Sequence, residues 1–309
     1  MSNSQIKFEN GFYSFVGKNG KNYRSKSLGY IEFQFSRNGS GLSVNFASTS
    51  ETNTSVAAST PTQKFSINER FAFLEDYVSM VSDKIQNSVV IVGIPGSGKS
   101  TVVNKTLAKE GFVDISNVEK FIDGEALPKK HYKVVKGYST PKALYRLLYE
   151  NKNSILVCDD MDNILNDAVA TNLLKGALDS SPDRIISWNA ESFKGDDDLP
   201  RSFRFNGGVI FISNIVKEKV PAAIRSRSVL IDIQMTLDEK IDRMKYVMLE
   251  EDFMPEAGMD IKLQAMDIIE KYKHEAKDVS LRSLIQVTKI FQKFSGAKAE
   301  KLALYALSN

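Results

Sequence analysis

The chain has 309 residues, with 41 Lys and Arg against 38 Asp and Glu, and a formal net charge of +3. One cysteine and two histidines exclude a disulfide framework and give no zinc-binding pattern, and no apolar run approaches the ~20 residues needed to cross a bilayer. The polar residues 1–5 do not resemble a signal peptide, so we expect a cytoplasmic protein without a membrane partner.

Residues 1–46 predict a small antiparallel β domain, with a meander over residues 11–46. Asn19-Gly20 and Asn38-Gly39 are hairpin-turn signals, and apolar residues alternate over 30–35 and 42–46. Residues 1–62 hold six basic and three acidic side chains, so this part carries the whole surplus of positive charge. Its aromatic rings interleave with basic residues and could stack nucleic-acid bases, or they could simply form the core of a small domain.

Residues 47–63 are small and polar, which predicts a flexible linker. From residue 64, helical and strand patterns alternate. The predicted strands cover residues 89–92, 132–135, 155–158, 209–212 and 229–233. The predicted helices cover residues 68–84, 99–109, 141–150 and 164–178, and after residue 237 the pattern is helical only. Helices between unalternating apolar strands predict an α/β fold: a parallel sheet covered on both faces over residues 64–236, then a helical lid over residues 237–309.

The segment after the first of these strands carries the clearest motif. It reads Gly93-Ile94-Pro95-Gly96-Ser97-Gly98-Lys99-Ser100-Thr101 and fits the phosphate-loop pattern G-x-x-x-x-G-K-[ST]. Glycines let backbone N–H groups surround phosphates, and the following helix adds a partial positive charge. Lys99 can reach the β and γ phosphates, and Ser100 can ligate Mg²⁺. The motif therefore predicts binding of a nucleoside triphosphate, with ATP and Mg²⁺ as the expected cofactors.

Asp159 and Asp160 follow the strand 155–158 directly. The carboxyl edge of a parallel sheet is where ligands bind, so Asp159 is a candidate Mg²⁺ ligand and Asp160 a candidate for orienting and polarising the attacking water. A structural alternative is a helix N-cap, for which Asp162 and Asn163 are better placed.

With these motifs the chain resembles the AAA+ ATPases over residues 65–309. The loop 93–101 and the segment 155–160 look like Walker A and Walker B. Asn214, at the end of the strand 209–212, looks like the sensor 1 residue. Arg225 and Arg227 lie in a segment similar to the arginine-finger region, and Arg282 looks like sensor 2. Surface solvation is the alternative for Arg225 and Arg227.

The resemblance implies an ATPase that works as a homo-oligomeric, hexameric ring, in which Arg227, helped by Arg225, serves the neighbouring subunit's nucleotide. The chain departs from the family at Asp160, where glutamate is usual. Aspartate is shorter by one C–C bond, or ~1.5 Å, and a misplacement near 1 Å can cost on the order of 100-fold in rate. We therefore expect hydrolysis that is slow unless the backbone compensates.

Residues 184–188 and 203–206 predict a hairpin with its tip at 192–198. It resembles the hairpin before sensor 1 in helicase and branch-migration motors, and the whole arrangement is most similar to single-module AAA+ proteins of bacteriophages. This implies a motor that acts on DNA in the host cytoplasm, with Phe193 and Lys194 as candidate contacts. Three aspartates at the tip oppose a phosphate-facing role, and a hairpin that only packs subunits is an equal alternative. Protein remodelling and a nucleotide-switched assembly factor are the rival functions.

Overall fold

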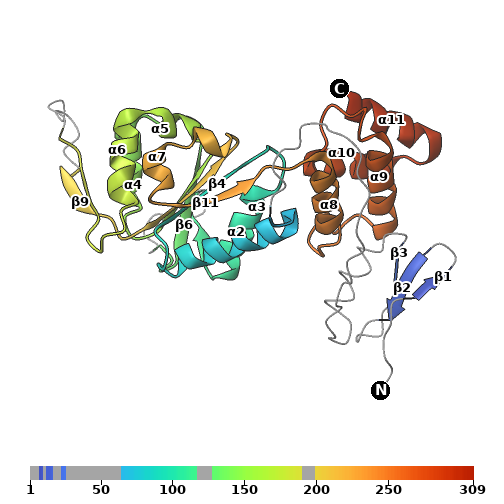
Figure 1. Cartoon of the computed structure of the whole chain (residues 1–309), viewed down its shortest axis with the longest axis horizontal. Helices are drawn as coiled ribbons and strands as arrows, with labels where there is room; N and C mark the ends of the chain where they lie inside the picture. Colours follow the sequence, from blue (N-terminus) through green and yellow to red (C-terminus); the bar gives the residue numbers. More distant parts are fainter. Residues whose placement is uncertain (1–6, 10–11, 17–21, 26–63, 117–126, 190–198) are drawn as a thin grey trace, which may run out of the picture. The chain divides into compact units, whose positions relative to one another are not determined.

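The computed structural model describes residues 7–9, 12–16, 22–25, 64–116, 127–189 and 199–309. Its internal contacts divide the chain into two units, Met1–Thr62 and Gln63–Asn309. Figure 1 shows the helices and strands with the labels used below. Within the described ranges, no helix combines the length and the apolar character that a bilayer crossing requires.

The described part of the first unit is a three-stranded antiparallel sheet with β2 in the middle. Its strands are β1 Lys7–Glu9, β2 Phe12–Val16 and β3 Asn22–Ser25. β2 and β3 flank the predicted turn, with Val16 opposite Asn22, while β1 precedes the predicted meander. Asn19-Gly20 itself, the strands expected over 30–35 and 42–46 and the expected linker lie outside the described residues.

The second unit is built on a six-stranded sheet with the order β11-β4-β10-β7-β6-β5, and every pairing in it is parallel. The strands are β4 Ser88–Gly93, β5 Val113–Asp114, β6 His131–Lys136, β7 Ile155–Asp159, β10 Gly208–Ser213 and β11 Val229–Ile233. The predicted parallel α/β fold is confirmed. Strand β5 was not expected, because two residues are too few to give a pattern.

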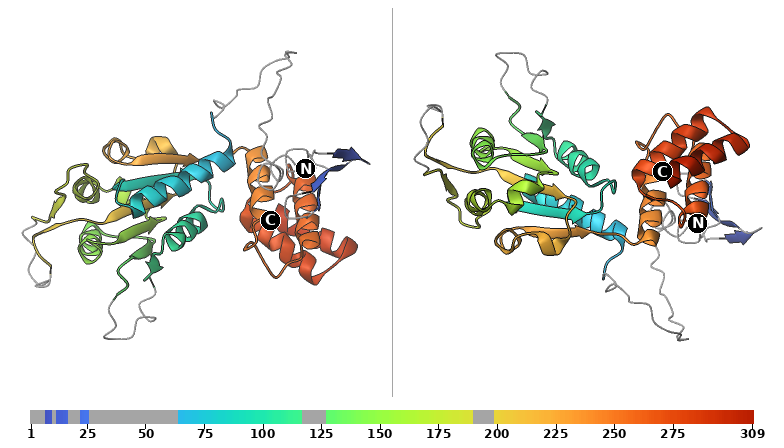
Figure 2. Two further views of the ribbon diagram at one scale, coloured as in Figure 1. Left: turned by 90° about the horizontal axis from the view of Figure 1, so that it is seen from below. Right: turned by 90° about the horizontal axis from the view of Figure 1, so that it is seen from above.

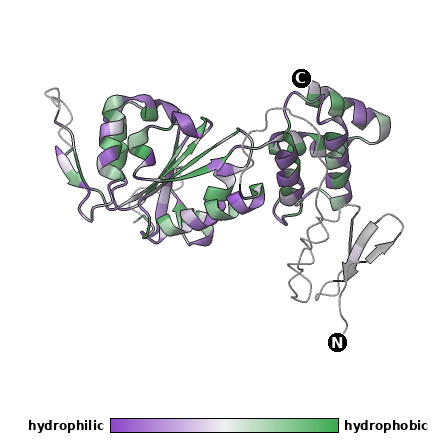
Figure 3. Cartoon of the chain, viewed as in Figure 1, coloured by the Kyte–Doolittle hydropathy of each residue, from purple (hydrophilic) through white to green (hydrophobic). Residues whose placement is uncertain are grey.

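Two helical layers explain why the strands are apolar on both faces. In β4, Val89 and Ile91 pack against one layer, and Val90 and Val92 pack against the other. The first layer holds α2 Ile67–Ser82 and α3 Lys99–Lys109. The second holds α4 Pro141–Glu150, α5 Asp162–Asn166, α6 Ala168–Ala177 and α7 Ala222–Arg225. Figure 1 shows the two layers on opposite sides of the sheet, and Figure 3 shows the strands between them as largely hydrophobic.

A helical part follows the last strand, as predicted. It consists of α8 Leu237–Met248, α9 Met259–Tyr272, α10 Leu281–Lys293 and α11 Gly296–Ser308. These helices share a hydrophobic core of their own, which includes Met244, Ala265 and Leu284. The helical part therefore has a packed core separate from those of the two layers on the sheet.

The expected hairpin is present as two short antiparallel strands, β8 Ile185–Ser187 and β9 Ser202–Arg204. Ile186 lies opposite Phe203, and both side chains are buried. The strands lie beside α6 at the margin of the α/β core (Figure 2). The expected tip, residues 192–198 with Phe193 and Lys194, lies outside the described residues.

The single helix expected over residues 164–178 is wrong. The structure has two helices, α5 and α6, separated at Asp167, whose backbone is extended (φ −91°, ψ 125°). The Asp167 side chain accepts a hydrogen bond from the Ala170 N–H at 2.8 Å. Aspartate favours this capping position because its carboxylate satisfies an N–H group that has no partner within the helix.

Replacing Asp167 tests this break. Asp167→Ala removes the cap, and we expect the free energy of unfolding to fall by about 1 kcal/mol. Asp167→Asn keeps an oxygen acceptor and should stay close to the parent chain. Urea unfolding of the three proteins gives the comparison, and equal losses for both variants would contradict the capping role.

Candidate nucleotide site

The loop between β4 and α3 has a backbone that only glycine adopts readily. Gly93, Gly96 and Gly98 have positive φ angles of 156°, 70° and 95°. A Cβ atom at Gly93 would lie 2.7 Å from the backbone of Ile233 in the neighbouring strand. The glycines of the motif are therefore required by the conformation of the loop and by its close approach to β11.

Lys99 begins α3 and is only 5% exposed. Its Nζ donates hydrogen bonds to Gly93 O at 2.9 Å, to Ile94 O at 2.7 Å and to Asn214 Oδ1 at 3.1 Å. Burial lowers the pKa of Lys99 to about 8, although the charges of Asp160 and Asp159 act in the opposite direction. A partly desolvated ammonium group thus lies at the base of the loop, where an anion would stabilise it.

Ser100 and Asp159 come together as expected. The Ser100 hydroxyl donates to Asp159 Oδ1 at 3.1 Å, and Lys136 Nζ lies 2.9 Å from Asp159 Oδ2. A hydroxyl beside a buried carboxylate is a donor set that Mg²⁺ accepts, with water and phosphate oxygens as its other ligands. These two residues fit a magnesium ion, provided that the Lys136 ammonium moves away from Asp159.

Asp160 projects from the same strand end with a left-handed backbone (φ 56°). Its N–H donates to Ile212 O at 2.9 Å, and its Oδ1 accepts from Asn214 Nδ2 at 2.6 Å. Burial, with help from the charges of Asp159 and Asp162, raises the pKa of Asp160 above its usual range. Asp160 does not cap a helix, since the N-cap of α5 is Met161.

Arg282 reaches the same place from the helical part. It lines a cavity of about 500 Å³ together with Lys99, Asp159, Asp160 and Asn214. At the start of α10, the Leu281 N–H donates to Gly96 O of the loop at 3.1 Å. The cavity therefore lies between the carboxyl ends of the strands and the helical part.

The Ser97 hydroxyl gives separate evidence that the loop fits a phosphate group. The Ser97 hydroxyl lines the cavity, is buried and has no hydrogen-bond partner within the described residues. Buried polar groups are rarely left without a partner, because the desolvation cost is not offset. A ligand oxygen in the cavity would supply one.

Arg225 and Arg227 are not brought to this cavity. Ser228, next to Arg227, contacts Ser88 at the start of β4 with the two hydroxyl oxygens 2.7 Å apart. The phosphate loop follows the other end of β4, about 17 Å away along the strand at ~3.3 Å per residue. Arg227 donates to Ala223 O at 3.0 Å within its own segment, and Arg225 is exposed.

Several residues that line the cavity were not expected from the sequence. Lys136 follows the predicted strand 132–135 at the ligand-binding edge of the sheet, so its position in the sequence could have predicted that it lines the cavity. Arg243 of α8 and the ion pair of Lys105 with Glu250, at 2.9 Å, are contributed by contacts between distant segments. Local sequence patterns do not predict contacts of this kind.

Comparison with known proteins gives only weak likenesses. No protein-family model matches the chain, and no curated protein does. Among solved structures, PCH-2 of C. elegans is similar at 14% identity over 78% of this chain and 67% of that one, with a TM-score of 0.41. A RuvB mutant of Thermotoga maritima is similar at 11% identity over 72% of this chain and 68% of that one, with a TM-score of 0.38. The structure of Drosophila ORC bound to DNA is similar at 13% identity over 84% of this chain and 70% of that one, with a TM-score of 0.42. At these values, the sheet order and the cavity carry the argument for fold and function.

The buried ammonium group predicts a pH effect on stability. Between pH 8 and 10.5 the unfolded chain keeps the Lys99 proton that the folded chain releases, so this group makes the free energy of unfolding rise with pH. Relative to a Lys99→Met variant, the parent chain should gain about 1–2 kcal/mol between pH 7 and pH 9.5. Urea unfolding at both pH values checks this, and a pH-independent difference between the two proteins would contradict it.

Proposed function

We propose that this chain is an ATP-hydrolysing motor of the AAA+ family, with a core of residues 64–236 and a lid of residues 237–309. The observation that supports the proposal most is the shared cavity. It combines a glycine loop with a buried lysine, two carboxylates at a strand end, an asparagine from the adjacent strand and an arginine from the helical part. Each of these groups has a use in phosphoryl transfer.

In this proposal the loop 93–101 binds the triphosphate through its N–H groups and Lys99, and Ser100 and Asp159 hold Mg²⁺. The metal would neutralise charge on the β and γ phosphates. Asp160 orients the attacking water and accepts its proton at a carboxylate oxygen. The raised pKa of Asp160 suits this task, because a more basic carboxylate takes a proton more readily. Asn214 holds both Asp160 and Lys99 in place.

Two arginine positions would stabilise charge in the transition state. Arg282 does so within one subunit, because it lines the cavity. Arg227, with Arg225 as its helper, lies at the opposite edge of the sheet and can act only on a neighbouring subunit's nucleotide. We therefore propose a closed homo-oligomer, a hexameric ring, in which each site is completed by the next subunit.

The substrate that we propose is DNA, in replication, recombination or helicase action in the cytoplasm. The β8–β9 hairpin before β10 supports a DNA substrate. It also supports the proposed likeness to the single-module bacteriophage motors. Phe193, Lys194 and the basic N-terminal domain are the proposed contacts. Tyr138 is a further candidate, because it is 81% exposed and so does not belong to the core.

Mixing two inactive variants tests the shared site. Arg227→Ala should bind ATP like the parent chain but lose turnover by about 1,000-fold or more. Lys99→Ala should lose ATP binding while keeping an intact Arg227. In an equal random mixture roughly a quarter of the sites join a working loop to a working Arg227, so activity should return.

Phosphate release and fluorescent-nucleotide binding give these values, with Arg201→Ala, an exposed arginine elsewhere, as the matched control. Full activity of Arg227→Ala alone would refute its role. No recovery on mixing would refute action between subunits.

Stimulation of ATP hydrolysis tests the substrate. Single-stranded DNA, double-stranded DNA and unfolded protein are added in turn at 50 and 200 mM salt. We expect stimulation by DNA that weakens at the higher salt, since phosphate contacts release counterions. Stimulation by protein alone would favour remodelling, and ATP binding without turnover under any condition would favour a nucleotide switch.

A further inference from the structure

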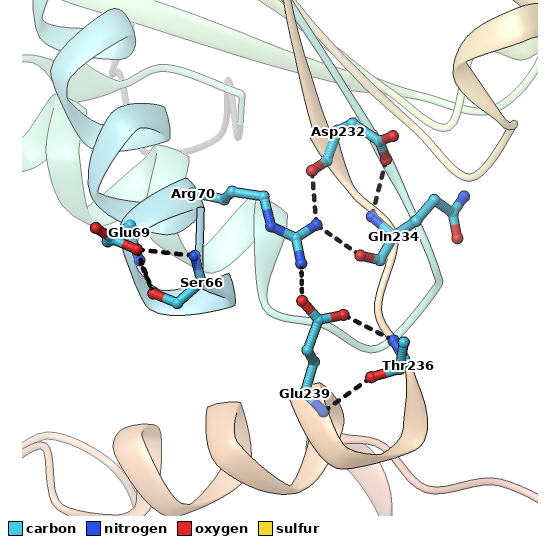
Figure 4. Close-up of polar contacts among 7 residues, drawn as sticks. All are labelled: Ser66, Glu69, Arg70, Asp232, Gln234, Thr236 and Glu239. Atoms are coloured by element: carbon cyan, nitrogen blue, oxygen red, sulfur yellow. Dashed lines mark hydrogen bonds and ion pairs between the residues drawn. The ribbon is translucent and has the colours of Figure 1, made fainter. Parts of the chain in front are cut away.

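Arg70 is one of the side chains that join the α/β core to the helical part, beside Arg243 of α8, which donates to Asn68 Oδ1 at 3.3 Å. Arg70, in the first turns of α2, is 7% exposed in its side chain. Its Nη1 donates to Asp232 O at 3.0 Å and to Gln234 O at 2.6 Å, and its Nη2 donates to Glu239 Oε1 at 2.5 Å (Figure 4). These partners lie at the end of β11, just after it and in the first turn of α8. Arg70 thus contacts both sides of the connection formed by residues 234–236.

Glu239 has a second task at the start of α8. Its Oε2 accepts from the Thr236 N–H at 2.9 Å, and Thr236 Oγ1 accepts from the Glu239 N–H at 3.2 Å. This capping box defines where α8 begins and the direction in which the chain enters it. The ion pair with Arg70 therefore fixes that direction relative to α2, which packs on the sheet.

The direction of α8 affects the cavity because the helical part moves with it. α8 shares a hydrophobic core with α9 and α10, and α10 carries Leu281 and Arg282 against the phosphate loop. A helix of twelve residues is about 18 Å long, so a tilt of about 5° at its start moves its far end by about 1.6 Å. A displacement of about 1 Å at a reacting group can cost on the order of 100-fold in rate.

The chemistry of the Arg70 contact indicates that it orients the helical part rather than adds to the stability of the fold. Arg70 Nε is buried and has no hydrogen-bond partner within the described residues. An apolar side chain at this position would not carry the desolvation cost of that group. The planar guanidinium can reach two carbonyl oxygens and a carboxylate together, which an ammonium group cannot do with the same fixed angles.

We propose that Arg70 is a positioning residue: by holding Glu239 and the 234–236 connection, it sets the angle of the helical part and so places Arg282 against the triphosphate. The statement about Arg282 rests on the proposed function, whereas the statement about the angle does not. Two experiments separate them.

The first experiment measures the angle through a distance. Spin labels are attached to cysteines introduced at Lys109→Cys on α3 and Lys301→Cys on α11, both exposed positions. The native Cys158 is buried and its pKa is raised to about 12, so it reacts little with the label. Without added nucleotide, the labelled parent chain should give a narrow distance distribution, and Arg70→Met a broader one.

Lys245→Met is the matched control, because it removes an ion pair with Glu270 inside the helical part (2.9 Å) and leaves the connection intact. Glu239→Gln is the milder variant: it keeps an oxygen for the Thr236 N–H and removes the charge that pairs with Arg70. It should broaden the distribution as well, and it replaces Arg70→Met if that variant does not fold. A distribution as narrow as that of the parent in the folded variants would overturn the proposal.

The second experiment asks whether Arg70 acts through Arg282. Arg70→Met should lower kcat/KM for ATP by about 10- to 100-fold in the parent chain, but by less than about threefold when Arg282→Ala is already present. An equal loss in both backgrounds would show a general effect on the fold and refute the link. If Arg282→Ala alone leaves turnover unchanged, the proposed role of Arg282 fails, and the distance measurement still decides the role of Arg70.

Discussion

The buried ammonium group of Lys99 is the constraint on which the arrangement of the site depends. Its partners are two carbonyl oxygens and one amide oxygen, and in the described part of the chain it forms no ion pair. A cation in such a place is costly, as the lowered pKa shows, and an anion in the cavity would repay that cost. Gly96 and Gly98, which line the same cavity, also have positive φ angles, a backbone conformation that other residues adopt only with strain.

Asp160 shows how the backbone changes what a short side chain can do. A strand that simply continued past Asp159 would direct the next side chain to the opposite face of the sheet. The left-handed turn at Asp160, held by its N–H bond to Ile212 O, instead lets its carboxylate meet Asn214. Aspartate tolerates this conformation better than most residues. The shorter reach that the sequence suggests is thus accompanied by a change in direction, which the sequence does not reveal.

The parts that the sequence predicted are those set by local chemistry. Apolar runs predicted the central strands, and the helix predicted over residues 99–109 has the same limits as α3. Asp159 was recognised because it ends a buried strand. The break at Asp167 was missed because the apolar spacing continues across it, and only the capping bond interrupts the helix. Arg70 was missed for another reason: its partners are more than 160 residues away, and such a contact leaves no periodic trace.

Two geometric conditions on the site follow from where its cations lie. Arg282 is carried by the helical part, so its place depends on the angle at residues 234–236. Arg227 lies near the start of β4, at the opposite end of that strand from the phosphate loop, so in the proposed ring it would meet only the triphosphate of a second copy of the chain. The first condition is internal, and Arg70 can impose it before any assembly forms. The second cannot be met by one chain, because β4 separates Arg227 from its own loop by more than the length of an arginine side chain. In the proposed motor, a single chain would bind nucleotide, whereas full turnover would need the arginine of a neighbouring subunit.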